Sequence, residues 1–377
     1  MFKTLRNSTP QQWLMVVVIT LAAYVVVDWT LGQLAKQYVN RRVFANAGRY
    51  QGYVTHVDLH LWKCSYTVKN LTIRRKDGSE ELPFAVVDHV DTKISWLGLL
   101  QGEVLMSAEI EGLTLNFVDA KKDEDQQFGR GTNWLNVFDK IIPSPMDQVR
   151  ITDANIRLLN RDTNPPVDVE ITDIEVKITN LNNVAEKTGE KVADAKLQGK
   201  IFGQSPLRVD AVFDPFEFDD LALTAEIRDI DLTEANTLAQ AYGHADFKSG
   251  SGEVAVELQV NGGKIDGYIM PLFEDVDIIS WSQDVIEQHD NPLELAWEGL
   301  LGIGTIFLTN LGTDKIATRI GISGTLKDAE ISTWRGFFGF LENAFIDGFN
   351  VDFEKLDAEE TKALTSVEMQ SKKSKAK

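Results

Sequence analysis

The sequence predicts a mainly β protein in which one apolar helix precedes an elongated, twisted antiparallel β-sheet with a few short helices. Three observations predict this fold. Residues 13–34 are almost entirely apolar. From residue 50 onward, apolar and polar side chains alternate with a period of two, which is typical of strands with one dry face. The continuous apolar runs of a buried parallel sheet are missing, so the common nucleotide-binding architectures are not expected.

The first element is long enough to cross a membrane as a helix, because about 20 apolar residues span a hydrocarbon core of about 30 Å. Trp13 and Trp29 lie near the ends of the run, where interfacial aromatic residues gather. The residues after the run offer only a poor cleavage site, so we expect an uncleaved signal-anchor at 13–34 that follows a cytoplasmic segment at 1–12. A buried core helix is the alternative. The residues expected to anchor the chain are Trp13, Leu14, Val17, Ile19, Leu21, Val25, Val27 and Trp29.

The charges beside this run do not decide its orientation. Lys3 and Arg6 precede it, whereas Lys36, Arg41 and Arg42 follow it. The positive-inside count is therefore close to balanced, and charge alone leaves the topology open.

One spacing recurs along the predicted strands: apolar, two other residues, apolar, one other residue, apolar. A step of three would move the apolar side chains to the opposite face, unless a bulge or tight bend restores the face. The pattern is either a coincidence among strand-rich segments or a repeating strand-bend-strand unit. It begins at Val54, Val68, Ile110, Ile151, Ile171, Ile227 and Leu326.

A few helices are expected between the strands. Residues 133–142 have helical spacing, and residues 233–242 form a second candidate with Thr233 as its N-cap and Gly243 as its stop. The apolar segments 292–310 and 334–349 are further candidates. Their apolar stretches 293–311 and 337–349 are expected to pack in the core, or else to rest on a membrane or a second subunit. The charged tail, 351–377, is expected to be disordered.

Composition and motifs argue against several classes of function. The formal net charge of −19 is unlike the basic surface of a nucleic-acid binder. The lone Cys64, interpreted as a small buried residue, excludes an intramolecular disulfide and a cysteine-rich metal site. No catalytic motif is found, and we assign no catalytic, cofactor-binding or metal-binding residue. His56, Asp58 and His60 share one face of a strand, but it is the wet face opposite Val57.

Seven segments carry a resemblance to a known family when they are taken in order. They are VDLHLWKCSYTVKNLTI at 57–73, ISWLGLLQGEV at 94–104, IEGLTLNFV at 110–118, TNW at 132–134, DLTEAN at 231–236, KIDGYIMPLFEDV at 264–276 and IGISGTLKDA at 320–329. In this order they resemble the AsmA-like superfamily of bacterial envelope proteins, in particular a branch known only as a domain of unknown function. One departure is Ala329, where the closing motif of the family often has proline.

The resemblance implies a single-pass inner-membrane anchor with the bulk of the chain in the periplasm. It also implies that residues 50–350 form a long twisted sheet folded into a groove with an apolar lining. Larger relatives are held to carry phospholipids between membranes along such a groove. The resemblance supplies no catalytic residues.

A sheet with one dry face needs a cover, because soluble proteins rarely expose apolar patches above a few hundred Å². Acyl chains would suit, since two chains of about 15 carbons represent roughly 20–25 kcal/mol of burial at about 0.8 kcal/mol per methylene. We therefore expect phospholipid binding or transfer that contributes to envelope lipid homeostasis. The candidate groove lining is Leu113, Leu115, Ile174, Val176, Ile178, Leu221, Leu223, Ile227, Val254, Val256 and Leu258.

Two other functions stay open. The first is a non-catalytic structural or assembly module that binds envelope proteins. It gains weight because about 14 strands, at about 4.8 Å each, would give a groove only about 65 Å long. The second is an envelope hydrolase that depends on Asp58 or His60.

Overall fold

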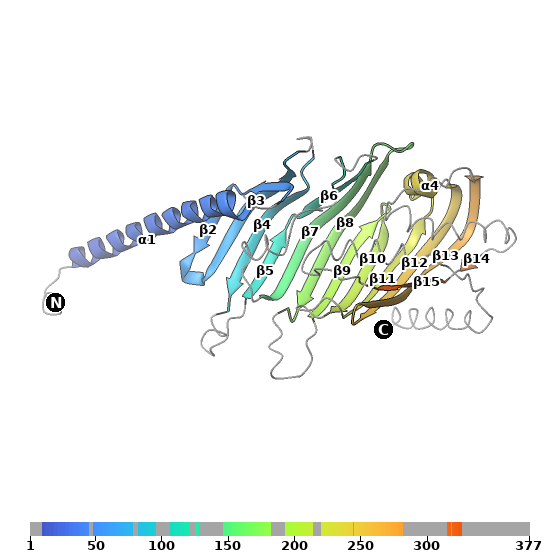
Figure 1. The fold of residues 1–377 in the computed structure, drawn as a ribbon. Helices are drawn as coiled ribbons and strands as arrows, with labels where there is room; N and C mark the ends of the chain where they lie inside the picture. The colour runs from blue at the N-terminus through green and yellow to red at the C-terminus, as the bar shows by residue number, and fades with distance from the viewer. Residues whose placement is uncertain are drawn as a thin grey trace.

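The fold is one large sheet with a long helix running into its edge (Figure 1). A computed structural model describes residues 10–44, 48–77, 82–95, 106–120, 125–127, 146–181, 193–213, 220–243, 245–281, 315–317 and 319–325. Within them the chain is mainly β, as predicted. The helix expected at 133–142, the apolar segments 292–310 and 334–349, and the tail lie outside the described residues.

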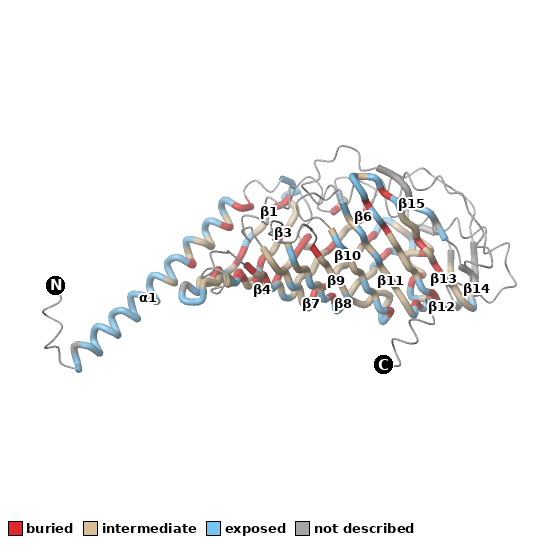
Figure 2. The backbone as a smooth tube through the Cα atoms, turned by 90° about the horizontal axis from the view of Figure 1, so that it is seen from below, coloured by how far each residue is buried: buried red, intermediate tan, exposed pale blue. Residues whose placement is uncertain are grey.

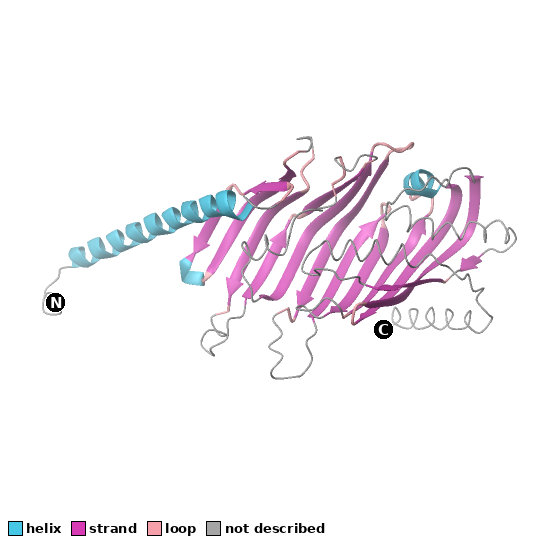
Figure 3. Ribbon diagram, in the orientation of Figure 1, coloured by secondary structure: helices cyan, strands magenta, loops and turns pink. Residues whose placement is uncertain are grey.

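Figure 3 shows how few helical elements accompany the strands. They are α1 (Pro10–Tyr38), the π-helix η2 (Val39–Val43), the 3₁₀ turn η4 (Leu61–Lys63) and α4 (Asn236–Gly243). The strands are β1 (Tyr50–Tyr53), β2 (His56–His60), β3 (Ser65–Arg75), β4 (Ala85–Ile94), β5 (Met106–Glu111), β6 (Thr114–Asp119), β7 (Met146–Asn160), β8 (Val167–Thr179), β9 (Ala193–Ile201), β10 (Ser205–Phe213), β11 (Leu221–Asp231), β12 (Ala245–Asn261), β13 (Lys264–Trp281), β14 (Lys315–Ala317) and β15 (Ile320–Thr325).

The 15 strands share twelve positions across the sheet. The order is β1-β3-β4-β5-β7-β8-β9-β10-β11-β12-β13-β14, while β2 pairs with β3, β6 with β4 and β7, and β15 with β13. Three positions are thus each filled by two short strands in succession. At about 4.8 Å between neighbours, the sheet is about 53 Å across, less than the width expected from about 14 full strands.

The expectation of a purely antiparallel sheet was wrong at one place, and the sheet is mixed. β5 and β6 run antiparallel to β4 but parallel to β7. Parallel neighbours need a crossover connection of a dozen or more residues, and residues 120–145 supply it. Side chains alternate in the same way in both kinds of pair when one face is wet, so the sequence pattern did not reveal the crossover.

Strand pairing places the apolar residues of successive strands in one continuous row. Each member of the row is the register partner of the next, which puts all of them on one face, called here the apolar face. The row runs through Val57, Val68, Val90, Ile110, Ile151, Val176, Leu197, Val209, Ala225, Val256 and Ile269.

The chain neighbours of these residues form a matching row on the other face, called here the polar face. Its members are Asp58, Thr67, Asp91, Glu109, Arg150, Lys177, Lys196, Asp210, Thr224, Glu257 and Tyr268. The two rows show that register, once set, keeps one side of the sheet apolar across eleven positions.

Steps of three in the apolar pattern coincide with residues in the left-handed backbone region. Ile151 and Ala154 are three residues apart, yet they pair with Val176 and Ile174, which are two apart. Both side chains therefore stay on the apolar face, because β7 contains one extra residue at this point. The left-handed residue occupies the third place of the pattern at Asn70, Gly112, Asp153, Asp173 and Asp229, with φ between 49° and 68°.

Two helices cover limited parts of the apolar face. Val39, Val43 and Phe44, at the end of the long helix, are buried against the first strands. Ala239 of α4 is buried against Ile230 and neighbouring residues near the other end. Figure 2 shows α1 exposed over most of its length and buried where it meets the sheet.

Each helix end is fastened to the sheet region by an asparagine side chain that makes the two hydrogen bonds of a backbone partner. Asn40 accepts from Val54 N at 2.7 Å and donates to Val54 O at 3.1 Å. Asn236 accepts from Phe247 N and donates to Phe247 O, both at 2.8 Å. Two bonds from one planar amide fix the orientation as well as the distance of the helix end.

Two local expectations are corrected by this geometry. The helix predicted at 233–242 begins at Asn236, because Asp231 Oδ1 accepts from both the N–H and the hydroxyl of Thr233 and holds it in a turn. Cys64 is half-buried rather than buried, and it has a left-handed φ of 47° at the turn into β3.

Ion pairs between neighbouring strands stabilise the polar face. Lys69 lies 2.8 Å from Asp58, and Lys93 lies 2.8 Å from Glu109. Arg157 on β7 binds Asp168 on β8 through both Nε and Nη2. These cross-strand pairs favour one register over a slipped one.

We predict that Asp153→Val destabilises the sheet, whereas Asp153→Gly does not. A β-branched residue is strained at φ 52°, and the left-handed region costs L-residues about 1–2 kcal/mol. Urea unfolding of the full chain in detergent should show this difference between the two variants. Equal stability of the two variants would contradict a left-handed bend at this position.

Asp168 is predicted to contribute to stability above about pH 4. The hydrogen bond from Arg157 lowers the pKa of Asp168 below its usual value. A carboxyl with a lowered folded-state pKa stabilises the protein above its unfolded pKa of about 3.9, and this contribution is lost as the pH falls through the folded value. Asp168→Asn should therefore flatten the acid limb of a melting-temperature profile and lower the neutral plateau; an unchanged acid limb would contradict the pairing.

Candidate functional site

The exposed apolar helix is the first feature with functional meaning. The helical stretch Trp13–Val43 has a mean hydropathy of 2.2, and none of its most apolar window is buried. It is long and apolar enough to cross a membrane, and the alternative of a buried core helix is wrong. All eight predicted anchor residues are exposed, from 49% at Trp13 to 68% at Leu14.

The last turns of α1 meet the sheet at the start of the apolar face. Gly32 is buried against β2, where a Cβ atom would lie only 2.6 Å from Val57 O. Only glycine permits this approach. Asp28, one turn earlier on the same helix face, has an Oδ1 atom that is buried without a hydrogen-bond partner. The apolar row therefore begins where the helix contacts the sheet at Gly32.

The predicted groove-lining residues lie together in the structure. Ten are in strands β6, β8, β11 and β12, and their pairings place them on the apolar face. The eleventh, Leu113, lies at the break between β5 and β6 and packs against the core beside α1. Ile174 and Leu258 are buried, and the remaining nine are half-buried. No observation tests the role of these residues, which stays a prediction.

Burial along the apolar row is uneven. Val57, Val68 and Val90 are at most 7% exposed at the α1 end, and Ile269 is 8% exposed near the other end. Between them, the seven members from Ile110 to Val256 are only half-buried. The middle of the apolar face thus keeps contact with solvent although it consists of aliphatic side chains.

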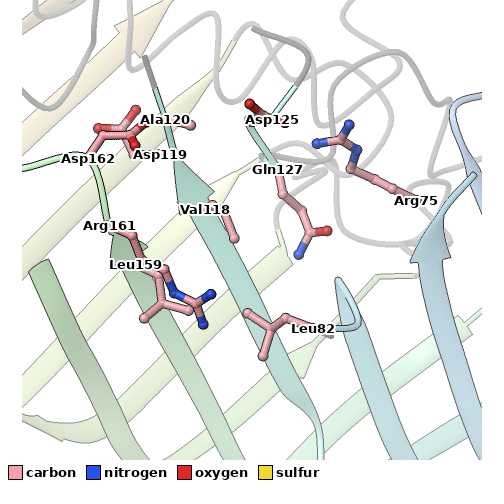
Figure 4. A pocket seen from close by; sticks show the side chains of 10 residues that line it. All are labelled: Arg75, Leu82, Val118, Asp119, Ala120, Asp125, Gln127, Leu159, Arg161 and Asp162. Carbon is pink, nitrogen blue, oxygen red and sulfur yellow. The ribbon is translucent and has the colours of Figure 1, made fainter. Parts of the chain in front are cut away.

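A separate pocket of about 270 Å³ lies where β6 and β7 end (Figure 4). Arg75 and Asp119 contribute to its wall, but both are engaged: Arg75 donates to Gln126 O at 3.0 Å, and Asp119 accepts from Asn160 at 2.8 Å. Val118 and Leu159 supply apolar surface. The mixed wall suits a small polar molecule better than an acyl chain.

Sequence reasoning missed this pocket. Its residues come from distant parts of the chain, and the parallel pairing of β6 with β7 brings Asp119 beside Asn160. No motif spacing signals such a meeting, so the pocket could not be found before strand order was known.

The acid–base candidates are placed on the polar face. His56 and His60 are exposed, and the carboxylate of Asp58 is paired with Lys69. Within the described parts of the chain, no cluster of His, Cys, Asp and Glu could hold a metal ion. Comparison with protein-family models and with curated proteins gives no match to this chain. The apolar face beside an apolar helix is therefore the strongest candidate site within the described residues.

We predict that Asn40→Ala loosens the joint between α1 and the sheet. The change leaves both backbone groups of Val54 without this partner, a loss of about 1–3 kcal/mol. Hydrogen exchange over residues 39–57 should rise. Asn40→Asp, which keeps the acceptor but loses the donor, should have a smaller effect.

Asn236→Ala is the matched control, since it breaks the same kind of clamp at α4. Exchange should then rise around Phe247 and stay unchanged around Val54. A rise over 39–57 in this control would show a general loosening of the fold rather than a local joint.

Proposed function

We propose that this chain is an inner-membrane-anchored, periplasmic protein of the AsmA-like superfamily that binds or transfers phospholipid along its apolar face and so contributes to envelope lipid homeostasis. The observation that carries the proposal is the unbroken aliphatic row from Val57 to Ile269, whose middle is only half-buried. Aliphatic surface of this extent needs a cover, and acyl chains are a cover of matching chemistry.

The bends support the further idea that the sheet is a groove built from a repeated strand-bend-strand unit. Bends on neighbouring strands lie beside one another: Asn70 donates to Thr55 at 2.9 Å, and Gly112 N donates to Thr152 O at 3.1 Å. A bulge bends its strand, so bends aligned across many strands would crease the sheet along one line.

The junction with α1 supports a route between bilayer and sheet. The apolar row starts at Val57, whose carbonyl contacts Gly32 of the helix. An acyl chain leaving a bilayer beside α1 would meet aliphatic side chains without first crossing a polar surface. Each methylene kept out of water is worth about 0.8 kcal/mol, so continuity of the lining decides how easily a lipid moves.

The mechanism needs no nucleophile. The polar face beneath the row is ion-paired and solvated, while the lipid headgroup would stay in water at the open side. A sheet about 53 Å across is short for a bridge between two membranes. The chain would therefore act with a partner or carry lipid over part of the route.

A single charge on the apolar face should abolish lipid binding. Val176→Asp places a carboxylate in the middle of the row, where acyl chains would have to desolvate it. The full chain purified in mild detergent should carry phospholipid, detected by native mass spectrometry and by lipid extraction. The variant should lose most of it.

Lys177→Asp is the matched control, because it adds the same carboxylate one residue along β8 but on the polar face. Its register partners Arg150 and Lys196 are both basic, so the new charge is well placed there. Circular dichroism and melting temperature verify that both variants fold. Wild-type protein without lipid, or equal loss in both folded variants, would refute lipid binding; a stoichiometric protein partner without lipid would favour an assembly module.

A further inference from the structure

Outside the helix α1, the described part of the chain exposes few large apolar side chains. Tyr53 is 48% exposed and Val212 is 41% exposed, whereas Trp62 reaches 85%. Trp62 belongs to η4, the short connection between β2 and β3, and the next residue, Lys63, is also exposed. An indole left almost wholly in water by its own chain is an unusual use of the residue with the largest apolar surface.

The connection that carries Trp62 lies close to the long helix α1. In both Figure 1 and Figure 2, the turn between β2 and β3 reaches back along α1, toward the N-terminal side of the point where the helix joins the sheet. Helix α1 packs along β2, and Gly32 fixes the contact at Val57. The turn therefore lies beside the part of the helix that precedes its contact with the sheet at Gly32.

That part of the helix carries the signs of a membrane–water boundary. Trp29 is 67% exposed there, and Lys36 follows two turns later. Trp13 and Trp29 are 16 residues apart, so they are separated by about 24 Å at 1.5 Å per residue, close to the thickness of a hydrocarbon core. Indole rings collect at this level of a bilayer because one edge is apolar and the N–H is polar.

We propose that η4, anchored by Trp62, is a second membrane contact that dips into the same interface as Trp29. This inference rests on the proposed membrane anchoring by α1. Trp62 inserts its ring among the headgroups. With α1 as the first point and η4 as the second, the sheet is held at a fixed tilt, with the start of the apolar row turned to the bilayer.

The test uses a fluorophore at position 63, so that Trp62 stays in place. The only cysteine of the chain, Cys64, is first changed to glycine, which suits its φ of 47°. Lys63→Cys is then labelled in the full chain and reconstituted into vesicles of phosphatidylcholine and phosphatidylglycerol that carry a nitroxide at headgroup depth. Gln204→Cys, in the exposed turn between β9 and β10, is the control position.

We expect the probe at 63 to be quenched about threefold more than the probe at 204, as an interfacial position requires. Trp62→Asp in the same labelled chain should bring the quenching at 63 down toward the control. Circular dichroism verifies that each labelled chain is folded.

Flotation of the vesicles is measured in parallel and separates the two claims. If the chain floats but the probe at 63 is quenched no more than the control, the η4 contact is wrong while the anchor stands. If Trp62→Asp leaves the quenching unchanged, Trp62 does not hold the turn in the interface. If the chain does not float, the membrane part of the proposed function and this inference both fail.

Discussion

The structure depends on one constraint: strand register must keep aliphatic side chains on the same face over the whole width of the sheet. If any strand slipped by one residue, its apolar side chains would move to the polar face and its charged side chains would move to the apolar face. Cross-strand ion pairs such as Lys93 with Glu109 oppose a slip on the polar face. The left-handed residues keep the apolar side chains on one face where a strand contains an extra residue. Without such a bend, the extra residue would move all later apolar side chains of that strand to the opposite face. Asp, Asn and Gly are the residues that tolerate this conformation, and they occupy those places.

The helices are joined to the sheet by hydrogen bonds that resemble those between neighbouring strands. Asn40 and Asn236 each offer one acceptor and one donor, the pair of groups that a neighbouring strand would offer to Val54 and to Phe247. The first clamp sits at the interruption between β1 and β2, where the edge strand leaves those groups without a ladder partner of their own. A helix fixed in this way cannot swing freely, so the direction of α1 and the plane of the first strands are coupled.

Local pattern was enough to predict the strands, because alternation is a property of each segment alone. It also indicated where bends would be needed, since a step of three cannot be reconciled with one dry face in any other way. The local pattern could not predict the order of the strands in the sheet or the contacts between distant segments. The parallel meeting of β5 and β6 with β7, the pocket beside Asp119 and Asn160, and the clamp from Asn40 to Val54 all join residues that no local spacing relates. The start of α4 was misplaced because Asp231 competes for Thr233 and keeps it in a turn.

Burial is distributed unevenly along the sheet, and under the proposed function this separates stability from lipid binding. Buried clusters at the two ends, around Val43 near α1 and around Ile265 in β13, supply the burial that holds the fold. The half-buried middle contributes less to stability, so the lipid cover that we propose would be exchanged without unfolding the protein. A fully sealed middle would hold the sheet more firmly but leave no surface for an acyl chain. A fully exposed middle would aggregate through its aliphatic surface. The intermediate burial from Ile110 to Val256 is compatible with the reversible lipid site that we propose.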